Sequence, residues 1–344
     1  MITPIRTLYR VSRVDTQRTQ QTPPVRRLHC SVCGNEVFFD SLQCLRCGTT
    51  MAMHPGDDGE LCVLDVATTV PCINRTTWAC NWPADPAGPF CRSCVLVDAT
   101  GHEHDPAMLP FQVAQRRALY QLTRLRVSWS SASGVPGRPA LRLRYRSKSS
   151  DTGVVIGHRG GVITLDLDEA DPAVQEGIRA RLGEQYRTPL GHLRHELGHY
   201  VWLTLIAPVP GQLEEFRQCF GDERENYQGA LRAHYRRSDD GTWRDQYASF
   251  YASAHPWEDF AESWAQLMHI HDVVETGTAW GVVQSPPDTE DATAWLAASI
   301  EATLAANELA RAMGMRDLYP FALSPGVLAK VAFCWRLVHL ETAG

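Results

Sequence analysis

The chain has 344 residues, enough for two domains or for one large domain with an appended module. Its hydrophobic fraction of 44% and charged fraction of 21% are typical of a globular protein that buries a substantial core. The net charge of −6 argues against a dedicated nucleic-acid-binding protein, and the sequence has no apolar run long enough to span a membrane.

Residues 1–27 form a locally basic segment that we expect to be flexible. Arginines alternate there with Thr, Gln and Val and never give way to an apolar stretch, so we expect neither a secretory signal nor a membrane anchor. A cytoplasmic location follows as an expectation. In a reducing compartment, 11 cysteines are expected to be metal ligands rather than disulfides. The arginines are Arg6, Arg10, Arg13, Arg18, Arg26 and Arg27.

Nine of the 11 cysteines lie between Cys30 and Cys94, which predicts a Cys-rich module over residues 28–105. Two Cys-x-x-Cys-Gly knuckles in this module are separated by ten residues, a spacing that resembles a rubredoxin-like zinc ribbon. The alternative of a redox Cys-x-x-Cys motif is disfavoured because no βαβ pattern surrounds the knuckles. The four expected zinc ligands are Cys30, Cys33, Cys44 and Cys47.

A second group of cysteines is less regular and contains one further Cys-x-x-Cys knuckle. Its four thiolates can close another tetrahedral zinc site, in which Cys62 is an alternative to Cys72. A closed site of four thiolates stabilises a segment too small to have its own core and has no open position for chemistry. The module therefore either stabilises the fold alone or also recruits a protein or nucleic-acid partner. The group consists of Cys72, Cys80, Cys91 and Cys94.

Residues 106–344 carry the remaining elements, and we expect them to form one domain. Helical spacing predicts a helix over residues 113–125, and alternating or glycine-flanked apolar runs predict short strands over residues 141–145, 153–156 and 161–167. From residue 171 onward the pattern is almost wholly helical. A small sheet followed by a mainly helical part indicates an α+β domain. The later helices are expected at residues 188–206, 213–220, 224–236, 256–276, 293–313 and 325–340.

The helix expected at residues 188–206 contains the pattern His-Glu-x-x-His. His195 and His199 are one turn apart on one face, so both imidazoles can bind one zinc ion. Glu196 then lies beside the metal, where it can act as general base toward a zinc-bound water. Peptide hydrolysis is the commonest use of this arrangement. A helix with two structural histidines is the alternative, because a five-residue pattern also occurs by chance.

A zinc hydrolase of this type needs a third protein ligand, and the helix that begins at Pro256 offers one in Glu258. Glu258 and Glu262 lie one turn apart among apolar neighbours, where unpaired carboxylates would be costly to bury. Glu258 can bind the zinc, and Glu262 can accept the free N–H of His195. The alternative is an ordinary acidic helix start, in which Glu258 favours the helix dipole and touches no metal.

These two segments together resemble the gluzincin metallopeptidases, in which a Glu on a second helix completes the His-Glu-x-x-His site. More narrowly, the chain resembles the bacterial family of putative zinc-binding metallopeptidases that carry an N-terminal zinc ribbon. The resemblance extends from about Cys30 to the last helix, and implies His195, His199 and Glu258 as ligands with Glu196 as base. It is carried by residues 161–171, 186–200, 220–224 and 255–262, and by segments around Cys72 and Cys80.

The resemblance also implies a strand against which an extended substrate is laid by backbone pairing. That role needs an unpaired edge, and the resemblance implies that residues 161–168 form this edge strand. The expected substrate-binding residues are Gly161, Val162, Ile163, Thr164 and Leu165.

A donor near the developing oxyanion is expected in addition to the zinc. Tyr251 precedes the helix with the third ligand and is the first candidate, and His255 is the second. Tyr200, Tyr235 and His192 are further candidates, although such residues more often have core or hydrogen-bonding roles.

The sequence thus predicts a zinc-dependent peptidase acting on a peptide or protein, with one catalytic and one or two structural zinc ions. One alternative is a scaffold protein in which every zinc ion is structural. A purely structural site does not need the Glu196 carboxylate beside the metal. Another is a nucleic-acid-tethered protease like the SprT-like proteins. The acidic net charge and the Glu in place of a third His argue against that alternative.

Overall fold

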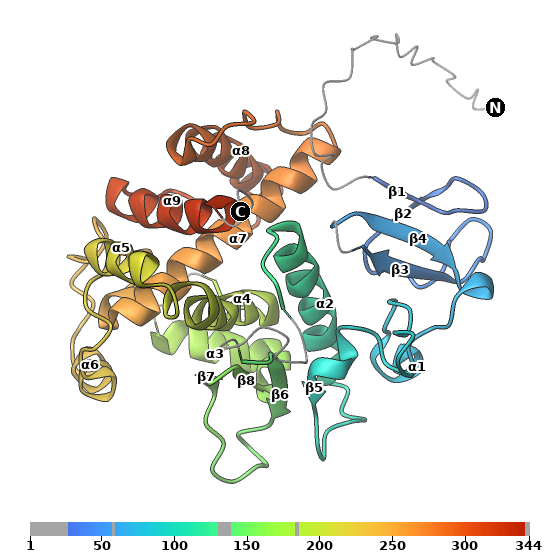
Figure 1. Ribbon diagram of the computed structural model, residues 1–344, viewed down its shortest axis with the longest axis horizontal. Helices are drawn as coiled ribbons and strands as arrows, with labels where there is room; N and C mark the ends of the chain where they lie inside the picture. The colour runs from blue at the N-terminus through green and yellow to red at the C-terminus, as the bar shows by residue number, and fades with distance from the viewer. Residues whose placement is uncertain (1–26, 57–58, 130–138, 183–185, 341–344) are drawn as a thin grey trace, which may run out of the picture.

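The computed structural model describes residues 27–56, 59–129, 139–182 and 186–340. The basic segment predicted at residues 1–27 lies outside these ranges except for Arg27. Two small hairpins, one four-stranded sheet and a set of helices make up the described chain (Figure 1). This is the α+β architecture that the sequence predicts.

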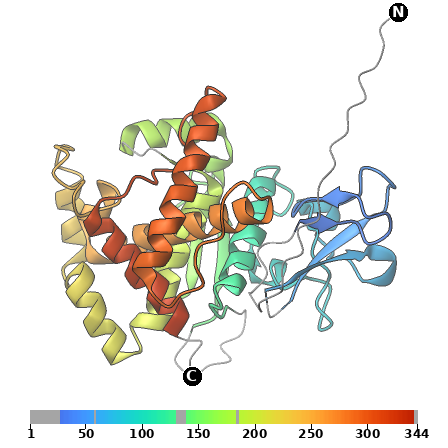
Figure 2. The same ribbon diagram turned by 90° about the horizontal axis from the view of Figure 1, so that it is seen from above.

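The Cys-rich region forms a compact part at one side of the molecule (Figure 2). Strands β1 (Leu28–His29) and β2 (Glu36–Val37) form one antiparallel hairpin, and β3 (Met51–Pro55) and β4 (Leu61–Asp65) form another. A single helical turn, α1 (Arg75–Trp78), follows. These elements are too short to bury a large apolar core, which is the situation in which thiolate-bound metal stabilises a fold.

The larger sheet has the strand order β5-β6-β8-β7, with β7 at one edge. Its members are β5 (Val97–Asp98), β6 (Arg142–Arg146), β7 (Gly157–Arg159) and β8 (Val162–Asp166). The pairs β5–β6 and β6–β8 are parallel, whereas β7 runs antiparallel to β8. The strand predicted at residues 153–156 is wrong, because the chain is still turning at Gly153 (φ 71°) and pairs only from Gly157 onward.

Helix α2 (Met108–Arg124) confirms the helix predicted at residues 113–125 but begins earlier. Asp105 Oδ1 accepts a hydrogen bond from the N–H of Ala107, which starts the first turn. Pro110 is tolerated there because residues in the first turn need no intrahelical N–H donor.

Two helices cross beside the sheet and carry the His-Glu-x-x-His pattern and the acidic pair (Figure 1). Helix α4 (Pro189–Val201) is capped by Thr188, whose Oγ1 accepts from the N–H of Gly191, and it continues into a π-helical turn over Trp202–Ile206. Helix α7 (Pro256–Ala279) is the longest helix of the described chain. The remaining helices are α3 (Pro172–Leu182), α5 (Pro210–Phe220), α6 (Tyr227–His234), α8 (Ala292–Ala312) and α9 (Pro325–Leu340).

Gly198 lies where α4 meets α7. A Cβ added at this position would lie 2.8 Å from Cα of Ala261 and 3.2 Å from its carbonyl oxygen. Only glycine allows the two helices to approach this closely, and this approach brings the histidines of α4 near the carboxylates of α7.

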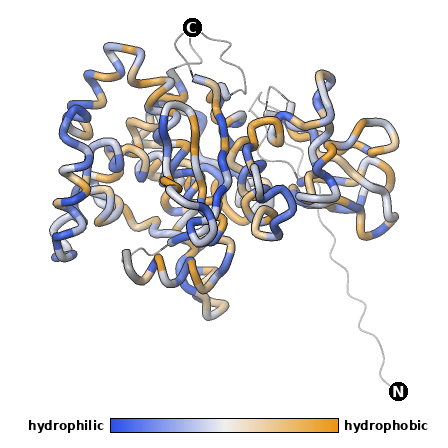
Figure 3. Tube along the Cα trace, turned by 90° about the horizontal axis from the view of Figure 1, so that it is seen from below, coloured by the Kyte–Doolittle hydropathy of each residue, from blue (hydrophilic) through white to orange (hydrophobic). Residues whose placement is uncertain are grey.

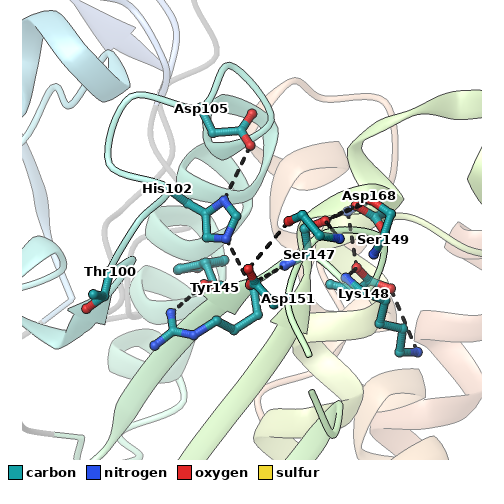
Figure 4. A network of polar contacts seen from close by, with 12 residues as sticks. Thr100, His102, Asp105, Tyr145, Ser147, Lys148, Ser149, Asp151 and Asp168 are labelled. Atoms are coloured by element: carbon teal, nitrogen blue, oxygen red, sulfur yellow. Dashed lines mark hydrogen bonds and ion pairs between the residues drawn. The ribbon is translucent and has the colours of Figure 1, made fainter. Parts of the chain in front are cut away.

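A polar network fixes the end of the sheet near β5 (Figure 4). His102, in the connection from β5 to α2, lies 2.9 Å from Asp151 in the turn after β6. Ser147 donates from its hydroxyl to Asp168 at 2.7 Å, and the backbone N–H of Ser149 donates to the same carboxylate at 2.8 Å. The network therefore ties the turns after β6 and β8 to the segment that follows β5.

Hydrophobic and hydrophilic residues are interspersed along the described trace (Figure 3). Within the described ranges, every helix is either too short or too polar to cross a lipid bilayer.

Candidate metal centres

The structure brings His195 and His199 of α4 together with Glu258 of α7. One ligand atom from each residue lies within 4.8 Å of the others. Oε2 of Glu258 is 3.1 Å from Nε2 of His195 and 3.5 Å from Nε2 of His199. Glu258 and His199 are buried, and the side chain of His195 is 12% exposed. Three donors of the types that zinc prefers therefore converge from two helices.

These spacings fit a tetrahedral zinc site. For bonds of about 2.0–2.1 Å to nitrogen and oxygen, the edge of the tetrahedron is about 3.3–3.4 Å. The two measured edges of 3.1 Å and 3.5 Å lie on either side of that value. Three protein ligands leave the fourth position open, as in catalytic zinc sites.

Neighbouring side chains orient these ligands. Nδ1 of His195 lies 2.7 Å from Oε1 of Glu262, which is the contact expected from the sequence and leaves Nε2 to face Glu258. The phenol of Tyr227, at the start of α6, donates to Oε1 of Glu258 at 2.6 Å. Burial alone would raise the pKa of Glu258, but the imidazoles of His199 and His195 hold it well below its usual range.

Glu196 is buried beside this cluster and has one unused oxygen. Its Oε1 lies 3.4 Å from Nε2 of His192, whereas Oε2 is buried and has no hydrogen-bond partner among the described residues. Burial by itself would raise the pKa of Glu196, but His192 and the two cluster histidines lower it. A carboxylate that is charged and has one free oxygen next to a three-ligand cluster has the properties of a general base.

Strand β7 runs directly over Glu196. A Cβ added at Gly157 would lie 3.9 Å from both carboxylate oxygens of Glu196. The next residue, His158, stacks at 6.2 Å from the ring of His199, and its Nε2 accepts the N–H of Gly161 at 3.1 Å. Burial lowers the pKa of His158 to about 4, with a further contribution from His199, so this imidazole is neutral at physiological pH.

The expectation that residues 161–165 form the sheet edge is wrong. Strand β8 carries these residues except Gly161 and pairs with β6 on one side and with β7 on the other. Within the described ranges, the outer side of β7 has no strand partner. The edge beside the metal cluster is therefore Gly157–Arg159. This edge strand could not be recognised from the sequence, because β7 is only three residues long and shows no alternation of apolar and polar residues.

The two candidate oxyanion donors have different surroundings. The ring of Tyr251 lies 6.1 Å from that of His195, and burial together with Glu258 raises the pKa of its phenol well above the ordinary value. His255 instead caps α7: its Nδ1 accepts the N–H of Trp257, and its Nε2 lies 3.2 Å from the carbonyl oxygen of Glu225. The structure thus favours a capping role for His255 over the predicted catalytic one.

The eight cysteines predicted as ligands form two groups of four. In the first, Sγ of Cys30 is 3.7 Å from that of Cys47, and the Cys33–Cys44 distance is 3.6 Å. For a Zn–S bond of about 2.3 Å the edge of a tetrahedron is about 3.8 Å, so these distances fit a zinc site.

The second group is fully buried, and its Sγ–Sγ distances also fit the edge of a tetrahedral zinc site. Sγ of Cys80 is 3.5 Å from that of Cys91 and 3.7 Å from that of Cys94. Cys72 is the fourth member, and the alternative Cys62 is exposed and outside the group.

Two contacts at the candidate site could not be found from sequence patterns. Tyr227 is 31 residues before Glu258, and Glu169, which lies 3.3 Å from Nδ1 of His192, is 23 residues before that histidine. Neither pair has a spacing that a helix or strand would impose, so only the folded chain reveals them.

Comparison with known proteins agrees with this geometry. Residues 107–337 match a family described as putative zinc-binding metallo-peptidase, and residues 27–101 match a zinc-ribbon domain. An uncharacterized protein of Mycobacterium bovis is 35% identical over 332 residues, which cover 91% of this chain and 95% of that protein. Uncharacterized proteins of two Mycobacterium tuberculosis strains match to the same extent. No solved structure shows significant similarity to the chain.

Proposed function

Because the chain belongs to the family of putative zinc-binding metallo-peptidases, we propose that it is a gluzincin-type peptidase with Glu196 as its general base. One observation carries this proposal. Oε2 of Glu196 is buried and has no hydrogen-bond partner in the described part of the chain, and it lies beside three residues that can hold one zinc ion. A scaffold protein with structural zinc alone would gain nothing from burying an unsatisfied carboxylate oxygen there.

The proposed ligands are His195, His199 and Glu258, with Glu262 orienting His195 and Tyr227 orienting Glu258. A bound zinc ion supplies Lewis-acid polarisation of a water molecule and of the substrate carbonyl. Side chains of the protein carry out the proton transfers.

In this mechanism Glu196 Oε2 takes a proton from the attacking water and delivers it to the leaving amine. The water oxygen bonds to the carbonyl carbon as the C=O electron pair moves onto the carbonyl oxygen. When the C=O bond re-forms, the C–N bond breaks and the amine leaves with the proton that Glu196 delivers. Tyr251 is the proposed donor to the carbonyl oxygen as it gains charge, because its ring lies 6.1 Å from that of His195.

We propose that the substrate backbone pairs with the outer side of β7. Such pairing places an extended peptide beside Gly157, whose missing side chain leaves room next to Glu196. Trp257 packs against the cluster, with its ring 4.1 Å from that of His199.

The Glu196→Gln variant tests the proposal. We expect it to keep its zinc content and its fold but to lose peptide hydrolysis by several orders of magnitude. Glu301→Gln, which changes an exposed residue of α8 in the same way, is the matched control. Zinc is measured by metal analysis and hydrolysis with a quenched fluorescent peptide library. Equal hydrolysis by both variants would refute the role of Glu196.

A further inference from the structure

His192 connects the proposed base to a second buried carboxylate. It lies one helical turn before Glu196 on α4, with Nε2 at 3.4 Å from Oε1 of Glu196. On its other side, Nδ1 is 3.3 Å from Oε2 of Glu169. The side chains of His192, Glu196 and Glu169 are 9%, 7% and 2% exposed. Three titratable groups thus form a row that is largely shielded from solvent.

The far end of this row is firmly anchored. Glu169 lies in the turn after β8, and Arg187 donates to it from Nη2 at 2.6 Å and from Nε at 3.0 Å. The neighbouring Asp168 accepts hydrogen bonds from Ser147 and Ser149 (Figure 4). Glu169 therefore cannot follow a movement of His192 without breaking a bidentate ion pair.

The charge state of His192 suits a link between two carboxylates. Burial alone would lower the pKa of His192, but the adjacent Glu169 and Glu196 raise it to about 9. At neutral pH the imidazolium has an N–H on both ring nitrogens and forms an ion pair with each carboxylate, at 3.3 Å to Glu169 and 3.4 Å to Glu196.

We propose that His192, held by Glu169, is a positioning residue that fixes the orientation of the Glu196 carboxylate. By holding Oε1, it leaves Oε2 as the oxygen that faces the attacking water. The inference rests on the proposed hydrolysis, and it assigns to His192 a task distinct from metal binding and from contact with substrate. A carboxylate free to rotate about its last bond would present the correct oxygen for only part of the time.

Two substitutions of His192 test the proposal. His192→Leu fills the space without a donor, whereas His192→Gln keeps an N–H group near the position of Nε2. We expect His192→Leu to lower kcat by about 10- to 100-fold with little change in KM or zinc content, because the base is misplaced while zinc and substrate remain bound. We expect His192→Gln to recover most of this loss.

Either of two kinetic outcomes would overturn the proposal: an unchanged kcat in His192→Leu, or a loss of kcat in His192→Gln as large as that in His192→Leu.

Crystal structures of wild type and His192→Gln provide a readout that does not depend on activity. We expect Oε1 of Glu196 to stay in place when the amide replaces the ring. An Oε1 that no longer faces residue 192 in His192→Gln would contradict the positioning role, even if wild type hydrolyses no peptide and the proposed function itself fails.

Discussion

Gly198→Ala should weaken zinc binding at the candidate catalytic site without touching any ligand. The new Cβ would lie 2.8 Å from Cα of Ala261, a backbone atom that cannot rotate away. Non-bonded carbon atoms sit about 3.5–4.0 Å apart, so α4 and α7 must separate by at least about 0.7 Å. His195 and His199 would move with α4, whereas Glu258 would stay with α7.

The expected loss follows from that displacement. Functional metal–ligand distances vary by only about 0.2 Å, so a shift of this size must be taken up by strain or by a lost ligand. Overpacking of this kind costs about 1–3 kcal/mol. If that strain is relieved when zinc leaves, the dissociation constant rises by about 5- to 150-fold, since each 1.4 kcal/mol is a factor of ten.

Competition with a chromophoric chelator measures this change in affinity. Gly177→Ala in α3 is the matched control, because no heavy atom lies within 4 Å of its added Cβ and the residue is exposed. Alanine is favoured over glycine in a helix by about 1 kcal/mol, so the control should be neutral or slightly stabilising. Wild-type zinc affinity in Gly198→Ala would show that the two helices do not set the site geometry.

Three further predictions concern other contacts. Tyr227→Phe removes the hydrogen bond to Glu258 and should lower the affinity of one zinc ion by about 10- to 100-fold, measured by chelator titration. Cys80→Ser should lower the zinc content by one ion per chain, whereas Cys62→Ser, outside both cysteine groups, should leave it unchanged in metal analysis. The folded-state pKa of His192 is about 9 against an ordinary 6.5, so its charge stabilises the fold fully below pH 6.5 and progressively less as the pH rises through 9. In urea unfolding, the stability advantage of wild type over His192→Gln should therefore be about 3 kcal/mol smaller at pH 10 than at pH 6.

The sequence could predict those parts of the site that helical periodicity determines. His195, Glu196 and His199 are neighbours on a single helix, and Glu258 and Glu262 share another. The geometry of a single helix is sufficient to predict that the residues within each set lie close together. The separation of 59 residues between His199 and Glu258 carries no such information. Glu258 was predicted from the need for a third ligand and from its position among apolar neighbours, and the resemblance to a known family then supported the link.

The sequence could not predict which strand forms the edge of the sheet. Strand order depends on pairing between distant segments, and β8 is more apolar and more regular than β7. An apolar run of that kind marks a buried interior strand as readily as an edge. The contact of His192 with Glu169 was missed for the same reason, because it joins α4 to the end of β8.

The boundary predicted near residue 105 follows cysteine composition, but the contacts of the folded chain cross it. Gln115 of α2 donates to the carbonyl and hydroxyl oxygens of Ser93, inside the Cys91–Cys94 knuckle, at 2.8 Å and 2.7 Å. The phenol of Tyr145 in β6 donates to the same Gln115 at 2.7 Å, and β5, three residues after the knuckle, pairs with β6. A metal ion held by the second cysteine group would therefore stabilise the large sheet directly. The edge proposed to bind substrate, β7, belongs to the same sheet and lies at the opposite end of its strand order from β5.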